Sequence, residues 1–312
     1  MVWGCFFLKA ASTFWKTFCN FEKTISAMLK RVFIISAVIL MSICNVALAK
    51  PRVGVVLSGG GALGYAHIGA LQALYEQGIE ADCVAGSSMG ALVGVMYAQG
   101  ITPQEIHDII LKEKYNDRKR ILHFSGRIKK SLGFATHANV RKTLQHYVAD
   151  SFDSLPKKFF ACVADITDSE ERVISSGGNL IDYVLASSSI PGVFEAIEID
   201  GHFYVDGGVL NNLPAREIRK ECDVLIGIDV HPDKSHEPVI ENVLDVAMAT
   251  LHALMQNNST EGRELCDYLV EPRANEQYKA FDFDNFEDIY RIGYEAMKAY
   301  LAEHPKLLAL GK

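Results

Sequence analysis

Two short apolar runs, each ending in a glycine-rich turn and followed by a helical pattern, constrain the fold of this chain most strongly. Residues 52–58 (RVGVVLS) lead into Gly59–Gly61, and apolar residues then recur at helical spacing over Tyr65–Gln77. The same pattern follows at once, with a run at Asp82–Gly86 and an apolar helix over Met89–Gln99. A strand covered on both faces needs such a continuous apolar run. The succession predicts neighbouring parallel strands joined by helices.

The rest of the chain keeps this alternation. Further strands are predicted at Phe159–Asp165, Arg172–Ser175, His202–Val205 and Asp223–Asp229, and long amphipathic helices at Val239–Gln256 and Phe286–Glu303. We therefore expect an α/β fold, with a mostly parallel central sheet covered by helices on both faces, in one domain without internal repeats. The hydrophobic share of 49% provides for a real core and excludes a disordered or collagen-like chain.

The first 49 residues differ from the remainder. Lys30-Arg31 precedes an apolar run from Val32 to Ala49 that ends in the small-x-small pattern of a signal-peptidase site. We expect a signal peptide over residues 1–49, cleaved near Ala49, and an exported protein in the periplasm, cell envelope or medium. Residues 1–27 are then a possible upstream over-extension, because Met28 stands directly before the basic pair. The alternative is an uncleaved leader that anchors the protein in a membrane.

The net charge of the remaining residues is more negative once this leader is set apart. The leader carries five basic residues against one acidic residue, so the whole-chain net charge of −7 leaves −11 on residues 50–312. We expect no nucleic-acid partner for this acidic chain. Lys112–Lys130 reverses the trend with eight basic residues against two acidic ones. This segment is either a solvated connector or a contact with an anionic lipid surface.

The first glycine turn predicts a site for negative charge. Gly59, Gly60, Gly61 and Gly64 stand between a strand and a helix, where backbone N–H groups point outward and a ligand can approach closely. The same residues satisfy G-x-G-x-x-G, which leaves a dinucleotide site as an alternative. That alternative needs an acid at the end of the next strand, whereas Asp82 stands at the start of it.

The second glycine turn predicts a nucleophile. Gly86-Ser87-Ser88-Met89-Gly90 has the spacing G-x-S-x-G, which places Ser88 on a tight strand-to-helix turn with its hydroxyl exposed. Gly86 and Gly90 are required there because side chains would crowd the neighbouring helix. The helix that follows offers free N–H groups to an anion formed at Ser88. The simpler alternative is an ordinary serine cap of that helix.

A serine nucleophile needs a base, and two kinds of base remain open. Asp206 is followed by Gly207 and Gly208 at the end of a predicted strand, so its carboxylate can be exposed in a tight turn. A catalytic triad would instead use one of His231, His236 and His252, none of which has a motif around it.

Several other residues have simpler expectations. His67 is predicted to pack within its helix, and Ser187–Ser189 to form a loop near the site. Asp165 and Asp168 are predicted to be solvated loop acids, not cation ligands. No Cys/His spacing suggests a metal site, and we expect neither metal nor cofactor.

The motifs LSGGGALGYAHIGAL, GSSMG and IPGVF…YVDGGVLNNLP, in this order, resemble the patatin-like phospholipase family over about residues 52–300. The likeness is to an exported bacterial member with a patatin domain only, over residues 50–312. It implies a three-layer α/β/α sandwich and a Ser–Asp dyad, with Ser88 as nucleophile and Asp206 as base. Gly59, Gly60 and Gly61 match the oxyanion-hole loop. Leu63 stands where the family often has Arg or Lys, so oxyanion stabilisation is assigned to backbone N–H groups.

The resemblance implies a serine-dependent acyl hydrolase that cleaves carboxylic esters of lipids through an acyl-enzyme, of the phospholipase A or lysophospholipase type. A lipid or phospholipid substrate follows from it, whereas the peripheral contact with a membrane surface is expected from the basic stretch Lys112–Lys130. Two alternatives use the same fold: a lipid-binding or regulatory protein with weak catalysis, and a lipid acyltransferase.

Overall fold

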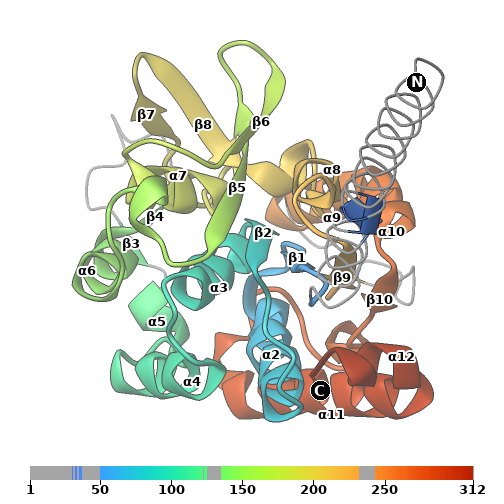
Figure 1. Cartoon of the computed structure of the whole chain (residues 1–312). Coiled ribbons are helices and arrows are strands. Elements are labelled where there is room, and N and C mark those ends of the chain that lie inside the picture. Colours follow the sequence, from blue (N-terminus) through green and yellow to red (C-terminus); the bar gives the residue numbers. More distant parts are fainter. Residues whose placement is uncertain are drawn as a thin grey trace, which may run out of the picture. The chain divides into compact units, whose positions relative to one another are not determined.

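The computed structural model describes residues 50–121, 123–124, 135–231 and 243–311, and, from the preceding segment, Lys30, Val32, Phe33, Ile35 and Ser36. Within these residues an eight-stranded sheet runs in the order β10-β9-β1-β2-β5-β8-β7, with β6 branching from β5 (Figure 1). Its strands are β1 (Val53–Leu57), β2 (Cys83–Ser87), β5 (Lys158–Asp165), β6 (Glu170–Ile174), β7 (Ile197–Ile199), β8 (His202–Asp206), β9 (Val224–Ile228) and β10 (Tyr268–Val270).

The sheet has a parallel part and an antiparallel part. Strands β10, β9, β1, β2 and β5 run parallel to one another, whereas β6 and β8 pair antiparallel with β5, and β7 pairs antiparallel with β8. All residues of β1 and β2 are buried, which explains their continuous apolar sequences. The prediction of a mostly parallel sheet is confirmed, but no sequence pattern indicated that β8, which ends at Asp206, runs antiparallel.

Helices cover both faces of the sheet (Figure 1). Successive residues of β1 point to opposite sides: Val55 and Leu57 belong to one core cluster, and Val56 to another. The first cluster lies under α2 (Tyr65–Glu76), α3 (Met89–Ala98), α4 (Pro103–Lys112) and α11 (Phe286–Glu303). The second lies under α8 (Ala215–Arg219) and α10 (Thr260–Leu265). The predicted three-layer α/β/α architecture is therefore confirmed.

The remaining elements lie around these layers. They are α5 (Arg118–Ile121), α6 (Ala138–Tyr147), α7 (Leu180–Ser187), α9 (Val243–Asn258), α12 (Pro305–Leu308), the small sheet of β3 (His123–Phe124) and β4 (Ala135–Thr136), and the short 3₁₀ turns η1 (Gly61–Gly64), η2 (Phe152–Ser154), η3 (Gly207–Val209), η4 (Ala274–Glu276), η5 (Phe283–Asn285) and η6 (Ala309–Gly311). The predicted helix at Phe286–Glu303 is confirmed residue for residue. The helix predicted from Val239 begins at Val243 in the described residues, and positions 239–242 lie outside them.

Residues Pro51–Lys312 form one compact unit, and Met1–Lys50 a separate one. Of the predicted signal peptide, only five helical residues are described, so its cleavage stays a prediction. Across the described residues, no helix combines the length and apolar character needed to cross a bilayer.

Candidate active site

Ser88 lies in the turn between β2 and α3, in a backbone conformation that few side chains adopt. Its φ is +54° and its ψ is −124°, a strained geometry of the kind found where a side chain must be held at a functional site. The flanking glycines make this turn possible. A Cβ on Gly86 would lie 2.3 Å from the carbonyl oxygen of Gly90, and a Cβ on Gly90 would lie 2.3 Å from that of Leu57. The sequence G-x-S-x-G thus forms the strand–turn–helix that it predicts.

Asp206 accepts a hydrogen bond from the hydroxyl of Ser88. Ser88 Oγ donates a hydrogen bond of 2.6 Å to Asp206 Oδ2, and both side chains are buried. The other carboxylate oxygen accepts the N–H of Gly208 at 2.8 Å. Burial raises the pKa of Asp206 from its ordinary value of 3.8 to about 7, although the hydrogen bonds from Ser88 and Gly208 oppose the rise. The pair therefore has the distance required for proton transfer and a carboxyl group that titrates near neutral pH.

The direction of β8 brings these two residues together. Ser87, the last residue of β2, is level with Cys162 of β5, and Asp206 is level with Val163. Because β8 is antiparallel to β5, its last residue arrives at the edge where β2 ends. A Cβ on Gly207 would lie 2.3 Å from the carbonyl oxygen of Cys162, so this close approach requires glycine directly after Asp206.

The glycine turn after β1 lies against Ser88. A Cβ on Gly59 would come within 2.9 Å of Ser88 Cβ, and one on Gly64 within 2.4 Å of Met89 Cγ. Gly61 has a φ of +55°, which favours glycine. The structure therefore brings both predicted glycine turns and Asp206 into one site.

The backbone N–H groups of this turn differ in their partners. Gly59 donates its N–H to Asn212, at 3.2 Å from the backbone oxygen and 3.1 Å from Oδ1. The N–H groups of Gly60 and Gly61 have no hydrogen-bond partner among the described residues. The N–H of Met89, in the first turn of α3, precedes any intrahelical acceptor. Gly59 thus anchors the turn, whereas Gly60, Gly61 and Met89 keep donors for an anion.

Asn212 connects this turn to the Asp206 turn, a role that the sequence did not reveal. Its backbone N–H donates to Asn258 Oδ1 at 2.9 Å, and Asn258 Nδ2 donates to the carbonyl oxygen of Gly208 at 2.9 Å. The side-chain amide nitrogen of Asn212 lies 3.4 Å from Ser259 Oγ. The only sequence signal was the position of Asn212 shortly after the two glycines.

Ser187 is a second residue whose role the sequence did not reveal. Ser88 donates its backbone N–H to Ser187 Oγ at 3.0 Å, and Ser187 Oγ donates to the carbonyl oxygen of Cys162 at 2.6 Å. Ser187 ends α7 instead of lying in a loop, although the expected proximity of Ser187–Ser189 to the site is correct. This contact fixes the backbone of Ser88 and occupies its N–H.

Comparison with known proteins identifies the family of this chain. The family model described as "Patatin-like phospholipase" matches residues 55–218, which contain Ser88 and Asp206. The chain belongs to the patatin-like phospholipase family. Lysophospholipase NTE1 of Saccharomyces cerevisiae is 28% identical over 297 residues, covering 81% of this chain and 17% of that protein. Patatin-like phospholipase domain-containing protein 7 of Rattus norvegicus is 31% identical over 280 residues, covering 78% of this chain and 20% of that protein.

This patatin-like chain therefore spans about a fifth of the length of these curated relatives. Among solved structures, VipD from Legionella pneumophila aligns with a TM-score of 0.46 at 14% identity, over 82% of this chain and 67% of that one.

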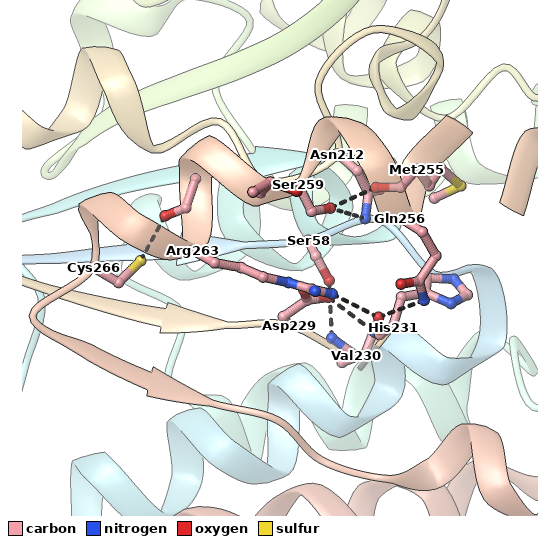
Figure 2. Close-up of polar contacts among 12 residues, drawn as sticks. Ser58, Asn212, Asp229, Val230, His231, Met255, Gln256, Ser259, Arg263 and Cys266 are labelled. Atoms are coloured by element: carbon pink, nitrogen blue, oxygen red, sulfur yellow. Dashed lines mark hydrogen bonds and ion pairs between the residues drawn. The ribbon is translucent and has the colours of Figure 1, made fainter. Parts of the chain in front are cut away.

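A second polar cluster of the patatin-like unit holds the end of β9 against α9 and α10. Arg263 Nε donates to the buried Asp229 at 2.7 Å, and its Nη2 donates to the carbonyl oxygen of His231 at 2.9 Å (Figure 2). Gln256 donates to the same oxygen at 2.9 Å, and Val230 donates its N–H to Ser58 Oγ at 3.0 Å. Because Ser58 leads into the glycine turn, this cluster supports that turn from behind.

The histidines do not complete a triad within the described residues. Neither His231 nor His252 forms a hydrogen bond with Ser88 or Asp206, and His236 lies outside the described residues. His231 is buried, which lowers its pKa to about 4, and its ring lies 4.9 Å from that of the exposed His252. His67 is fully buried with Nε2 2.8 Å from the carbonyl oxygen of Ser58, as expected for a packing residue.

One group of side chains in the described part has ligand types for a metal: Asp165, Asp168 and His202. Arg172 donates to both carboxylates at 2.8 Å, and His202 Nδ1 lies 3.0 Å from Asp165. These contacts account for the cluster as an ion-pair network. The prediction that Asp165 is solvated is wrong, because its position at the end of the buried strand β5 removes it from solvent. Asp82, required by the dinucleotide alternative, accepts the N–H of Val53 at the opposite end of the strands.

Proposed function

We propose that this protein is a serine-dependent hydrolase of carboxylic esters in lipids, of the phospholipase A or lysophospholipase type. The observation that carries the proposal is the buried hydrogen bond of 2.6 Å from Ser88 Oγ to Asp206 Oδ2, beside a glycine turn whose Gly60 and Gly61 N–H groups have no partner among the described residues. Its family and the lysophospholipase names of its relatives support a lipid ester as the substrate.

The reaction follows from these groups. Ser88 Oγ attacks the ester carbonyl carbon while its proton passes to Asp206 Oδ2. The carbonyl oxygen becomes an anion, for which the N–H groups of Gly60, Gly61 and Met89 are the available donors, each worth roughly 3 kcal/mol in the transition state. The C–O bond to the alcohol then breaks, and Asp206 returns its proton to the leaving oxygen. The acyl group remains on Ser88.

Water completes the cycle. A water molecule loses a proton to Asp206 and attacks the acyl carbon, and the ester bond to Ser88 breaks as Ser88 recovers the proton. The fatty acid then leaves. A carboxylate with an ordinary pKa is a weak base at pH 7, and the raised pKa of Asp206 makes it a better one. The dyad therefore needs no histidine.

The setting of the enzyme is also part of this proposal. A leader that is cleaved near Ala49 and an exported catalytic unit would place the enzyme beside envelope or extracellular lipids. Arg118 and Lys119 are exposed, and their side chains have no partner among the described residues. Such cations favour a peripheral contact with anionic lipid. Positions 125–130 of the same basic stretch lie outside the described residues.

The test is hydrolysis of a lipid panel by the purified protein, with products identified by mass spectrometry. We expect free fatty acid and lysolipid from the wild type, and losses of at least about 1,000-fold in Ser88→Ala and Asp206→Asn. His231→Asn and His252→Asn serve as matched controls and should retain most activity. Loss of activity in a folded histidine variant would replace the dyad with a triad.

Labelling by a fluorophosphonate separates the enzyme from a lipid-binding protein on the same fold. We expect wild-type protein to be labelled and Ser88→Ala to remain unlabelled. A wild type that binds lipid but neither reacts with the reagent nor hydrolyses any lipid would refute the proposal.

A further inference from the structure

An apolar cavity of about 60 Å³ lies beside α3, the helix that directly follows Ser88. Met89, Leu92 and Met96 of α3 form one wall, and Val140 and Leu144 of α6 contribute to the other. The four residues that α3 contributes, including Val93, recur at the spacing of one helix face.

The polar atoms around the cavity are satisfied by one another. Tyr115 Oη lies 2.7 Å from Thr143 Oγ1, and Tyr65 Oη donates to the carbonyl oxygen of Tyr115. The cavity therefore presents carbon surface, and an apolar cavity of this kind has no partners to hold water. This lining suits a hydrocarbon chain better than a polar group.

The cavity is coupled to the nucleophile through one residue. Met89 follows Ser88 directly, contacts the glycine turn at Gly64, and lines the cavity. A chain extending from a carbonyl carbon at Ser88 along α3 would therefore meet Met89 first. Methionine side chains are unbranched and flexible, so Met89 and Met96 can make way for a methylene chain.

We propose that this cavity is the acyl-chain site, and that Met96 and Val140 set the chain length that the enzyme accepts. The inference rests on the proposed ester hydrolysis. The cavity has less than half of the ~150 Å³ that binds benzene in an engineered protein, so it receives only a few methylene groups before the methionines must move. Chain-length selectivity is therefore limited by the side chains of α3 and α6.

The experiment changes the volume of the cavity in both directions. Met96→Ala enlarges it, Val140→Phe fills it, and Val95→Ala is the control, because Val95 is buried on the same helix but does not line the cavity. The measurement is kcat/KM for p-nitrophenyl butyrate, octanoate and dodecanoate.

We expect Met96→Ala to raise the dodecanoate-to-butyrate ratio about tenfold, the effect of burying roughly two more methylene groups. Val140→Phe should lower the octanoate-to-butyrate ratio by a similar factor, and Val95→Ala should leave both ratios within about twofold. Unchanged ratios in two folded cavity variants, or the same shift in Val95→Ala, would overturn the proposal.

A binding measurement separates this inference from the catalytic proposal. In the Ser88→Ala background no ester is turned over, and calorimetric titration with decanoate measures chain binding alone. We expect Val140→Phe to weaken decanoate binding about tenfold, whether or not the wild type hydrolyses lipids. Equal decanoate affinity with and without the phenylalanine would rule out the cavity as the chain site.

Discussion

The raised pKa of Asp206 makes a quantitative prediction about stability. The carboxyl group is fully buried, and its pKa rises from 3.8 to about 7 on folding. Between these two pH values the folded protein holds a proton that the unfolded chain has released. Stability therefore falls by about 1.4 kcal/mol for each pH unit over this window. A shift of about 3 units corresponds to about 4 kcal/mol, lost as pH rises through 7.

Asp206→Asn removes this dependence while keeping the contacts. An amide can accept the N–H of Gly208 through its oxygen and donate to Ser88 Oγ through its nitrogen, in place of the two contacts of the aspartate. We expect the variant to match the wild type in unfolding free energy near pH 4 and to exceed it by up to about 4 kcal/mol at pH 8.5.

The assay is urea unfolding of both proteins at several pH values between 4 and 8.5. The buried histidines titrate in both proteins, so their effects cancel in the difference between the two curves. We infer that burial destabilises the charged form of Asp206. A difference in unfolding free energy that stays constant with pH, or that favours the wild type at pH 8.5, would refute this inference.

Three further predictions concern rate and stability. The kcat/KM for ester hydrolysis should rise tenfold per pH unit on its acid limb and level off above about 7, where Asp206 has lost its proton; a limb near pH 4 would contradict the raised pKa. Asn212→Ala should lower kcat by up to about 100-fold with the fold retained by circular dichroism, because Gly59 loses a tether; full activity would disprove the positioning role. Arg263→Met should cost about 3–5 kcal/mol in urea unfolding by leaving Asp229 charged and buried, and adding Asp229→Asn should restore part of it.

Local sequence patterns predicted much of the fold. The strands at β1, β2, β5 and β9 were found because a strand buried on both faces must be apolar throughout. The two glycine turns were recognised from the spacing of their motifs, although distant segments make most of the close approaches that require glycine there, such as Ala280 at Gly61 and Leu57 at Gly90. The helix α4 was missed, although Thr102 and Glu105 form a capping box at its start.

The supporting contacts of the site could not be predicted in the same way. Asn212 acts on Gly59 and Ser187 acts on Ser88, over 153 and 99 residues of chain. An Asn or Ser side chain can hydrogen bond in many settings, and nothing in its local sequence names its partner. The burial of Asp165 was mistaken for the same reason, because its partner Arg172 and the depth of β5 appear only in the folded protein.

The sequence by itself determined the α/β class, the two glycine turns and the identity of Ser88 and Asp206 as candidates, since each could be recognised from a local pattern of residues. Tertiary structure decided that β8 runs antiparallel to β5, which brings Asp206 Oδ2 to 2.6 Å from Ser88 Oγ. It also decided the pKa of Asp206, because that value depends on the loss of water around the carboxylate. Residue type supplies the reactive groups, but their distance and solvation are set by packing between distant segments.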